Sequence, residues 1–405
     1  MKKAGLFLVV ILALAIVSLP GSADGTPAVY YVGGTGSGNY TSISQAIDAA
    51  GSGDRGIVYP GTYTPLDISK SLTIEGRQAV VPSIVVSAEH VNLSGFIVTG
   101  SSHGISIPGN HATVSGCIVL NHTYGITIEG SHACITGNHV FKNSYYGIWL
   151  KHAGAAQVDS NDVYRNHEGI YVHQADNATI TSNAIANNTY GIHLAGTRHA
   201  AIYHNAILDN RERGLYYCCQ SEENVIQGNV FMRNEVNAWG YDGANTWDDG
   251  SQGNYWDDSN GSSYIIDDDN IDHHPLQEPP VMPDFVDSIY ILSPAAGQQV
   301  NGSVVIRGVS EQAKSVDIRV DNGSWTRAQG NFLWRAVLDS TTLANGTHII
   351  QARCGNATAS LTVIVDNQAE TRDAIPAVAP AGILMALSAA LFLLRRRRFQ
   401  PARHA

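Results

Sequence analysis

Positive charge is scarce in this sequence. Its 405 residues include 24 lysines and arginines against 35 aspartates and glutamates, which gives a formal net charge of −11. Seven of the basic residues lie at the two ends of the chain, at Lys2, Lys3, 395–398 and Arg403. The long middle part is therefore strongly acidic, and such a surface repels nucleic acid and anionic lipid. The composition excludes a nucleic-acid partner.

Metal-ligating sulfur is also scarce. There are four methionines and five cysteines, and the cysteines show no metal-ligand spacing. Cys218 and Cys219 are adjacent and could remain two thiols or form a strained vicinal disulfide. His111 and His132 occupy equivalent positions of neighbouring repeats and could share one metal ion, and imidazole suits copper. Two histidines without a third ligand make a poor site, so we expect no required cofactor and no copper.

Long apolar runs occur only near the two ends. Lys2 and Lys3 precede an apolar stretch over 6–17 and a small-residue cleavage pattern, which predicts a signal peptide over 1–23. Residues 377–394 form an apolar segment of 18 residues, about 27 Å as a helix and long enough to span a bilayer. The basic tail 395–405 should remain in the cytoplasm. We therefore expect a secreted, membrane-anchored protein with its ectodomain outside the cell.

Glycine, in contrast, recurs with a period near 22 residues. Each repeat glycine opens a Gly-Ile/Leu stretch that ends on an apolar residue, and the glycines are Gly104, Gly125, Gly147, Gly169, Gly191 and Gly214. Short alternating strands with Asn/Gly corners at this period predict a stacked β-solenoid. Parallel crossover connections wind right-handed, so we predict an all-β chain built on a right-handed parallel β-helix.

The pattern predicts a series of segments along the chain. Residues 24–56 should form an N-terminal cap with a short helix over 42–50, and 57–240 the coils. Residues 241–280, rich in aspartate and tryptophan, should cap the far end, with Trp247 and Trp256 closing the apolar core. A linker over 281–287 then leads to six or seven alternating strands over 288–366, which predict an immunoglobulin-like sandwich. Residues 367–376 read as a spacer before the C-terminal transmembrane helix.

An aromatic column is the main candidate site. The second residue after each repeat glycine should face outward, and the residues before the glycines adjoin it. Flat rings beside polar groups suit sugar rings, but outward rings can also merely stabilise successive rungs. The predicted ligand-binding residues are Trp149, Tyr171, His193, Tyr216, Tyr124, Tyr146 and Tyr190.

Catalysis on this face would require a base together with a second ionisable group. The candidates are Glu129, Lys151, His173 and His193, with Glu168 as the other nearby acid. No pair of aspartates occupies adjacent coils on this face. Binding without chemistry is therefore the preferred interpretation, and an enzyme that processes polysaccharides is an alternative.

Two further kinds of site are suggested by local motifs. Asp267, Asp269 and Asp272 offer oxygen ligands for calcium, although the glycine that usually lets such a loop turn is missing and a solvated acidic cap is the alternative. Ten Asn-x-Ser/Thr sequons predict an N-glycosylated surface protein. They lie at Asn39, Asn92, Asn121, Asn177, Asn187, Asn260, Asn301, Asn322, Asn345 and Asn356.

Two stretches of the sequence resemble the NosD-type β-helix family. They are GNHVFKNSYYGI, at 137–148, and the segment over 246–276 that contains GNYWDD. The resemblance implies a pectate-lyase-like solenoid, of the carbohydrate-binding and sugar-hydrolase β-helix group. It also implies a copper-delivery accessory role as an alternative function. The spacer, apolar helix and basic tail are similar to the C-terminal sorting signals of archaeal surface proteins, although their Pro-Gly-Phe motif is absent.

The preferred function is therefore the binding of polysaccharide or cell-envelope glycan by an anchored surface protein. A polysaccharide lyase, epimerase or hydrolase, a copper-delivery accessory and a passive structural or adhesion rod are the alternatives.

Overall fold

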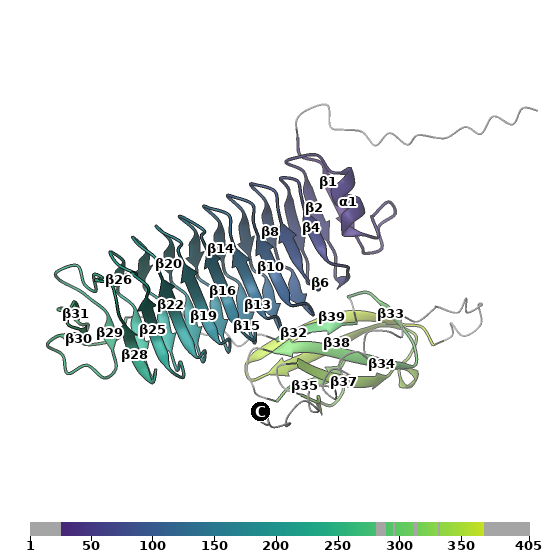
Figure 1. Cartoon of the computed structure of the whole chain (residues 1–405). Helices are drawn as coiled ribbons and strands as arrows, with labels where there is room; N and C mark the ends of the chain where they lie inside the picture. Colours follow the sequence, from purple (N-terminus) through teal and green to yellow (C-terminus); the bar gives the residue numbers. More distant parts are fainter. Residues whose placement is uncertain (1–25, 281–288, 295, 311–314, 331–332, 368–405) are drawn as a thin grey trace, which may run out of the picture.

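The structure, a computed structural model, describes residues 26–280, 289–294, 296–310, 315–330 and 333–367. Over these residues the chain forms a rod of stacked coils with a smaller β domain beside it (Figure 1). The predicted signal peptide 1–23, linker 281–287 and membrane anchor 377–394 lie outside them. Within the described ranges, no helix is long and apolar enough to cross a membrane.

The rod is a right-handed parallel β-helix of three sheets, as predicted. Each coil contributes one strand to each sheet, and successive coils pair in parallel. The first sheet consists of β1 (Val29–Val32), β2 (Arg55–Val58), β5 (Thr73–Gly76), β8 (Asn92–Ser94), β11 (Thr113–Ser115), β14 (Cys134–Thr136), β17 (Gln157–Asp159), β20 (Thr179–Thr181), β23 (Ala201–Tyr203) and β26 (Val225–Gln227).

The second sheet contains the strands that begin at or just before the repeat glycines. It consists of β4 (Leu66–Ile68), β7 (Ile84–Val86), β10 (His103–Ile107), β13 (Tyr124–Ile128), β16 (Tyr146–Lys151), β19 (Glu168–His173), β22 (Tyr190–Ala195), β25 (Arg213–Cys218) and β28 (Val236–Gly240). Two of these strands precede the first Gly-Ile stretch and one follows the last, so the coils extend beyond the visible repeat.

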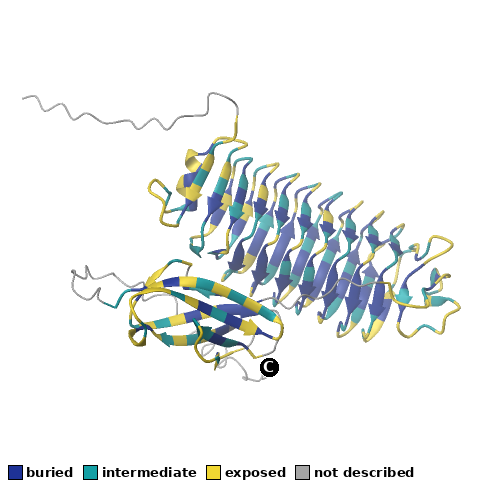
Figure 2. Ribbon diagram, turned by 180° about the vertical axis from the view of Figure 1, so that it is seen from behind, coloured by how far each residue is buried: buried dark blue, intermediate teal, exposed yellow. Residues whose placement is uncertain are grey.

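The third sheet completes each coil. It consists of β3 (Gly61–Thr62), β6 (Ala79–Val81), β9 (Ile97–Thr99), β12 (Ile118–Leu120), β15 (His139–Phe141), β18 (Asp162–Tyr164), β21 (Ala184–Ala186), β24 (Ala206–Leu208), β27 (Val230–Met232) and β29 (Tyr255–Trp256). One apolar core runs through all the coils, with inward residues such as Ile148, Val158 and Val163 fully buried. Figure 2 shows these buried positions along the strands of the rod.

The repeat glycines are required by the close stacking of the coils. A Cβ atom added to Gly169 would lie 2.6 Å from the carbonyl oxygen of Gly191, and one added to Gly191 would lie 2.4 Å from that of Gly214. No side chain fits at such a distance from backbone. The period of about 22 residues therefore records where one coil contacts the next.

Ladders of buried asparagine join the coils at their corners. At the predicted Asn/Gly corners, each side-chain amide nitrogen donates to the next side-chain oxygen at 2.9–3.0 Å, along the column Asn138, Asn161, Asn183, Asn205 and Asn229. A second ladder was not predicted from the sequence and consists of Asn143, Asn166, Asn188, Asn210 and Asn234. Cys117 begins the first column as a small buried residue, and its backbone amide donates to Asn138.

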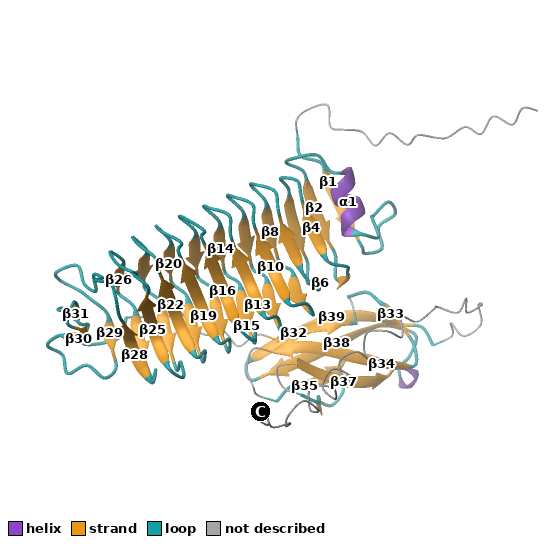
Figure 3. Cartoon of the chain, in the orientation of Figure 1, coloured by secondary structure: helices purple, strands orange, loops and turns teal. Residues whose placement is uncertain are grey.

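Both ends of the apolar core are covered. At the N-terminal end lies the predicted helix, α1 (Ile43–Ala49), beside β1 in Figure 3, and it buries Ile43, Ala46 and Ile47. At the other end Trp247 and Trp256 are 1% and 2% exposed and join the rod core. A hairpin of β30 (Tyr264–Asp267) and β31 (Asn270–Asp272) lies beyond them.

The second domain has two packed sheets, which confirms a β-sandwich. Its core includes Ile306, Ile350 and Trp334, and the last is 2% exposed and thus not available to a ligand. A short helix, η1 (Ser340–Thr342), follows the strand that ends at Asp339. One sheet contains β32 (Ile289–Ser293), β34 (Ser303–Ser310) and β37 (Leu333–Asp339), and the other contains β33 (Gln299–Val300), β39 (Ala357–Val365), β38 (Gly346–Cys354), β35 (Asp317–Val320) and β36 (Thr326–Arg327).

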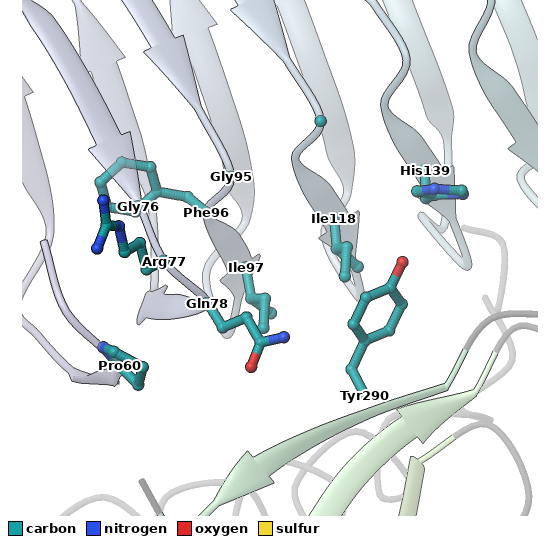
Figure 4. Close-up of a pocket in the computed structure, with 11 residues that line it drawn as sticks. Pro60, Gly76, Arg77, Gln78, Gly95, Phe96, Ile97, Ile118, His139 and Tyr290 are labelled. Carbon is teal, nitrogen blue, oxygen red and sulfur yellow. The ribbon is translucent and has the colours of Figure 1, made fainter. Parts of the chain in front are cut away.

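The sandwich packs against the outer face of the third sheet. Val309, Tyr290 and Leu292 of the sandwich join one apolar cluster with outward residues of the rod, namely Ile97, Ile118, Leu120, Phe141 and Tyr164. A cavity of about 460 Å³ lies at this junction, between Arg77, Gln78 and His139 of the rod and Tyr290 of the sandwich (Figure 4).

Candidate functional site

The outer face of the second sheet carries the predicted aromatic column. Trp149 pairs in register with Tyr171, Tyr171 with His193, and His193 with Tyr216. The inward neighbours of these residues, such as Ile148 and Leu150, are fully buried, so the strand alternation directs the rings outward as predicted. Each ring is partly exposed.

The rings form one continuous strip across successive coils. Tyr146 stacks on Tyr171 with ring centroids 4.7 Å apart, and His193 stacks on Tyr216 at 4.4 Å. Tyr171 and His193 are 4.7 Å apart. These distances lie in the range of favourable ring contacts. We call this strip the aromatic face, and it comprises Tyr124, Tyr146, Trp149, Tyr171, Tyr190, His193, Tyr216 and Trp239.

Trp239 extends the strip by one coil and was missed in the sequence. It pairs with Tyr216 and is 39% exposed. Its coil reads VNAWG, with Asn237 at the position of the repeat glycine, so the Gly-Ile pattern does not mark it. Trp239 lies 23 residues after Tyr216, and this spacing, close to the repeat period, could have identified it.

A guanidinium group lies over the C-terminal end of the aromatic face. Its carbon, the Arg213 Cζ, lies 4.1 Å from the ring centre of Trp239, 4.7 Å from that of Tyr216 and 5.7 Å from that of Tyr190. These are cation–π distances. No carboxylate among the described residues pairs with it. This end of the face therefore combines flat apolar surface with unpaired hydrogen-bond donors.

Four tyrosines of the aromatic face have raised pKa values, so their phenols are neutral at physiological pH. Burial raises the pKa of Tyr171 to about 12, and burial likewise raises the pKa of Tyr146 and of Tyr216. A hydrogen bond to Glu212 is the main cause that raises the pKa of Tyr190. Neutral phenols donate hydrogen bonds and stack, but they do not serve as bases.

The four predicted catalytic candidates separate into two groups. Glu129 and Lys151 form an exposed ion pair of 2.6 Å. His173 lies next to Lys151 in the register and stacks on Tyr171 at 5.7 Å. Burial is the main cause that lowers the pKa of His173, which keeps its imidazole neutral. Lys151 is therefore paired with Glu129, and the neutral His173 beside it carries no positive charge.

His193 belongs to a different cluster. Its Nδ1 lies 2.9 Å from Oε2 of the buried Glu168, and its Nε2 lies 3.5 Å from Sγ of Cys218. The carboxylate is thereby placed to fix the tautomer and the orientation of the ring. Glu168 was noted in the sequence only as a nearby acid, and its partnership with His193, one coil further along, follows from the stacking of the coils.

The acidic loop does not bring the predicted calcium ligands together. Asp267 accepts hydrogen bonds from Tyr217 and Asn270. Asp272 is fully buried and accepts from Trp256 Nε1 at 2.9 Å. In the part of the chain that the structure describes, no group of three or more His, Cys, Asp or Glu is arranged to hold a metal ion. Asp267 and Asp272 thus serve the hydrogen bonding of the cap, while Asp269 lines a separate acidic cavity of about 490 Å³.

The histidine column contains one more member than the sequence suggested. His90, His111 and His132 stack in successive coils, with ring centroids 4.8 and 4.9 Å apart and planes within 10° of each other. Parallel rings direct their nitrogen lone pairs in parallel rather than toward one point. This stack therefore does not form a common metal site.

The predicted glycosylation sites are accessible. Nine of the ten sequon asparagines are exposed, while Asn39 is half-buried and donates to the carbonyl oxygen of Gly33 at 2.6 Å. The exposed residues are Asn92, Asn121, Asn177, Asn187, Asn260, Asn301, Asn322, Asn345 and Asn356. Accessibility is what N-glycosylation requires, and glycosylation itself stays a prediction.

The fold and the repeat define a β-helix solenoid protein. Known families include one that is similar to part of this chain. Residues 47–216 match the family model described as "Periplasmic copper-binding protein (NosD)". Over these residues the solenoid is similar to the NosD-type right-handed β-helix family. The matched range ends before the terminal GNYWDD segment, which therefore lies outside it. A search of curated proteins gave no match.

Several solved structures are similar in fold. The A-module of mannuronan C-5 epimerase AlgE4 from Azotobacter vinelandii is 14% identical, with a TM-score of 0.45 over 50% of this chain and 70% of that one. Pectate lyase Pel9A is 16% identical, with a TM-score of 0.42 over 60% of this chain and 84% of that one. The periplasmic alginate epimerase AlgG is 15% identical, with a TM-score of 0.34 over 54% and 55%.

The side chains of the described residues do not form the copper site that the family's description implies. Copper sites in proteins are built from convergent imidazole, thiolate and thioether ligands. The histidine stack lacks this convergence, and none of the described His, Cys, Asp and Glu side chains forms a suitable cluster. No chemistry through copper is therefore derived for this chain.

Proposed function

We propose that this protein binds polysaccharide or cell-envelope glycan along the aromatic face. The observation that carries the proposal is the continuous strip of partly exposed rings from Tyr124 to Trp239, with stacking distances as short as 4.4 Å. Sugar rings place their C–H faces on aromatic rings and their hydroxyl groups on polar neighbours. Tyr190, Glu212 and Arg213 supply such neighbours.

The proposed setting is the outside of the cell. The predicted signal peptide 1–23 and apolar segment 377–394 would place the rod on the outer surface, and the immunoglobulin-like sandwich would separate it from the membrane. The accessible sequons fit this location. An aromatic strip on an acidic protein with accessible sequons suits neutral sugars or long glycans better than strongly anionic ones.

Binding to a panel of neutral and acidic polysaccharides tests the proposal. A Trp149→Ala/Tyr171→Ala variant should lose at least about fivefold in affinity, because two ring contacts of about 0.5–1.5 kcal/mol each are removed. The matched control is Tyr31→Ala/Tyr59→Ala, which removes a stacked pair of rings 6.3 Å apart away from the aromatic face. Equal loss in both variants, or no binding by the unmodified protein, would favour the passive structural rod.

A second candidate is chemistry on a bound glycan, as a lyase, epimerase or hydrolase. The observation that favours it is the buried Glu168 beside His193, since an oriented imidazole can act as a proton acceptor. Release of shortened or unsaturated products from any polysaccharide would support it. A His193→Gln variant that retains measurable glycan binding but gives no product would assign the chemistry to this ring.

A further inference from the structure

Two adjacent thiols lie at the edge of the aromatic face. Cys218, the last residue of β25, is buried, and Cys219 is exposed. Their sulfur atoms are 2.7 Å apart and are not joined by a bond. Cys219 and Gln220 both have positive φ angles, of 61° and 65°, which is uncommon for residues other than glycine. The turn thus presents one thiol to solvent directly beside a buried one.

The buried thiol faces an oriented base. His193 Nε2 lies 3.5 Å from the Sγ atom of Cys218, while Glu168 accepts a hydrogen bond from the opposite nitrogen at 2.9 Å. With Nδ1 protonated, Nε2 carries the lone pair and can accept the proton of the thiol. A carboxylate thus orients a base, and the base faces a thiol. This is the arrangement that activates a nucleophile. The three residues come from three successive coils, so only the stacking creates it.

We propose that Cys218 and Cys219 form a redox-active dithiol that exchanges with low-molecular-weight disulfides. The thiolate of the exposed Cys219 attacks one sulfur of the disulfide, and a mixed disulfide forms as the first thiol leaves. His193 then takes the proton of Cys218, whose sulfur attacks Sγ of Cys219. The Cys218–Cys219 bond forms, the second thiol leaves with the proton from His193, and the external disulfide has been reduced to two thiols.

The geometry also makes the resulting bond easy to reduce. Neighbouring Cα atoms are about 3.8 Å apart across a trans peptide, whereas disulfides usually join Cα atoms 4.4–6.8 Å apart. Strained and accessible disulfides are the labile ones. Burial raises the pKa of Cys218 to about 12, so this thiol ionises little unless a base accepts its proton. His193 is therefore a required participant in the second step.

The test uses the full-length protein in buffers of graded glutathione to glutathione-disulfide ratio, followed by acid quenching, alkylation and mass spectrometry. The peptide that contains both cysteines should lose two hydrogens, about 2 Da, and should regain them in reducing buffer. A Cys218→Ser variant should instead accumulate a stable glutathione adduct at Cys219. An adduct that persists in the unmodified protein, or the absence of any change, would overturn the proposal.

The role of His193 is tested by the rate of ring closure. His193→Gln should slow the conversion of mixed to internal disulfide by at least about tenfold, because the base is removed, and should flatten its dependence on pH. The matched control is His173→Gln, an imidazole on the same face that does not contact the thiols. Equal rates in the two variants would remove His193 from the mechanism. Glycan binding is not needed for either readout, so this proposal and the proposed function can fail separately.

Discussion

The same coils build the outer faces of the second and third sheets, yet the two faces differ in what covers them. On the third sheet the outward residues Ile118, Leu120 and Phe141 are 4%, 0% and 1% exposed, because the sandwich packs on them. On the second sheet the outward rings, such as Trp149 and Tyr171, remain partly exposed. The coil determines only that a residue points outward. The chemistry of the outward side chain then determines whether another domain packs on it or it remains exposed.

The difference follows from the polar atoms on each face. Aliphatic side chains have no polar atoms to keep hydrated, so covering them releases water at little cost. The aromatic face carries hydroxyl groups, an imidazole and a guanidinium, whose burial against another domain would need matching partners. A glycan supplies such partners as hydroxyl groups.

Replacing Asn183 by alanine should damage both faces together. Asn183 is fully buried, and its amide donates to the carbonyl oxygen of Val158 at 2.8 Å and to Asn205 at 2.9 Å. We expect a loss of about 3 kcal/mol or more, since each buried group left unpaired costs about 1–3 kcal/mol. Denaturant-induced unfolding measures it. Gln157→Ala, at an exposed position of the first sheet, is the control, and an equal loss there would contradict the ladder's role.

Introducing a charge on the third sheet should separate the two domains. Phe141 stacks on Tyr164 with ring centroids 4.9 Å apart, inside the cluster that contains Val309 of the sandwich. Phe141→Asp would bury an unpaired carboxylate there, which costs several kcal/mol, so the sandwich should undock. Small-angle scattering should show a larger radius of gyration with unchanged circular dichroism. Tyr171→Asp, on the open face, should leave the radius as it is.

Removing the guanidinium from the aromatic face should weaken glycan binding moderately. Arg213 lies over three rings, and a cation–π contact at a partly exposed site contributes about 0.5–1 kcal/mol. Arg213→Gln should therefore lower affinity about two- to fivefold, as read by titration calorimetry. Arg211→Gln, at an exposed position two residues earlier, should bind like the unmodified protein. Unchanged binding by both variants would place the glycan away from this end.

Acidification should cause the smallest effect, through His173. Burial lowers its folded-state pKa below the ordinary 6.5, so between these two values the unfolded chain binds more protons than the folded one. Stability is thus fully present above about pH 6.5 and falls as the pH drops toward the folded pKa. Between pH 7 and 5 the unmodified protein should lose slightly more in Tm than His173→Gln. Identical losses would mean that this ring is not desolvated.

Much of the architecture was predictable because it repeats. Three predictions were confirmed: the glycine period near 22, the corner asparagines and the helix over 42–50. Each depends on interactions within a short segment or between adjacent coils. The aromatic column could be predicted for the same reason, since strand alternation fixes which residues point outward. Trp239 was missed because its coil replaces the repeat glycine by Asn237.

The coil, its register and its outward columns could be read from the repeat, because they depend on contacts between equivalent residues one repeat apart. The docking of the sandwich on part of the third sheet, and the contacts among Glu168, His193 and Cys218, are visible only in the folded chain. The folded chain likewise commits Asp267 and Asp272 of the acidic loop to hydrogen bonds within the cap. These contacts are between side chains that occupy different positions in their repeats or lie in different domains. Their contact is therefore set by packing in three dimensions, which no period in the sequence records.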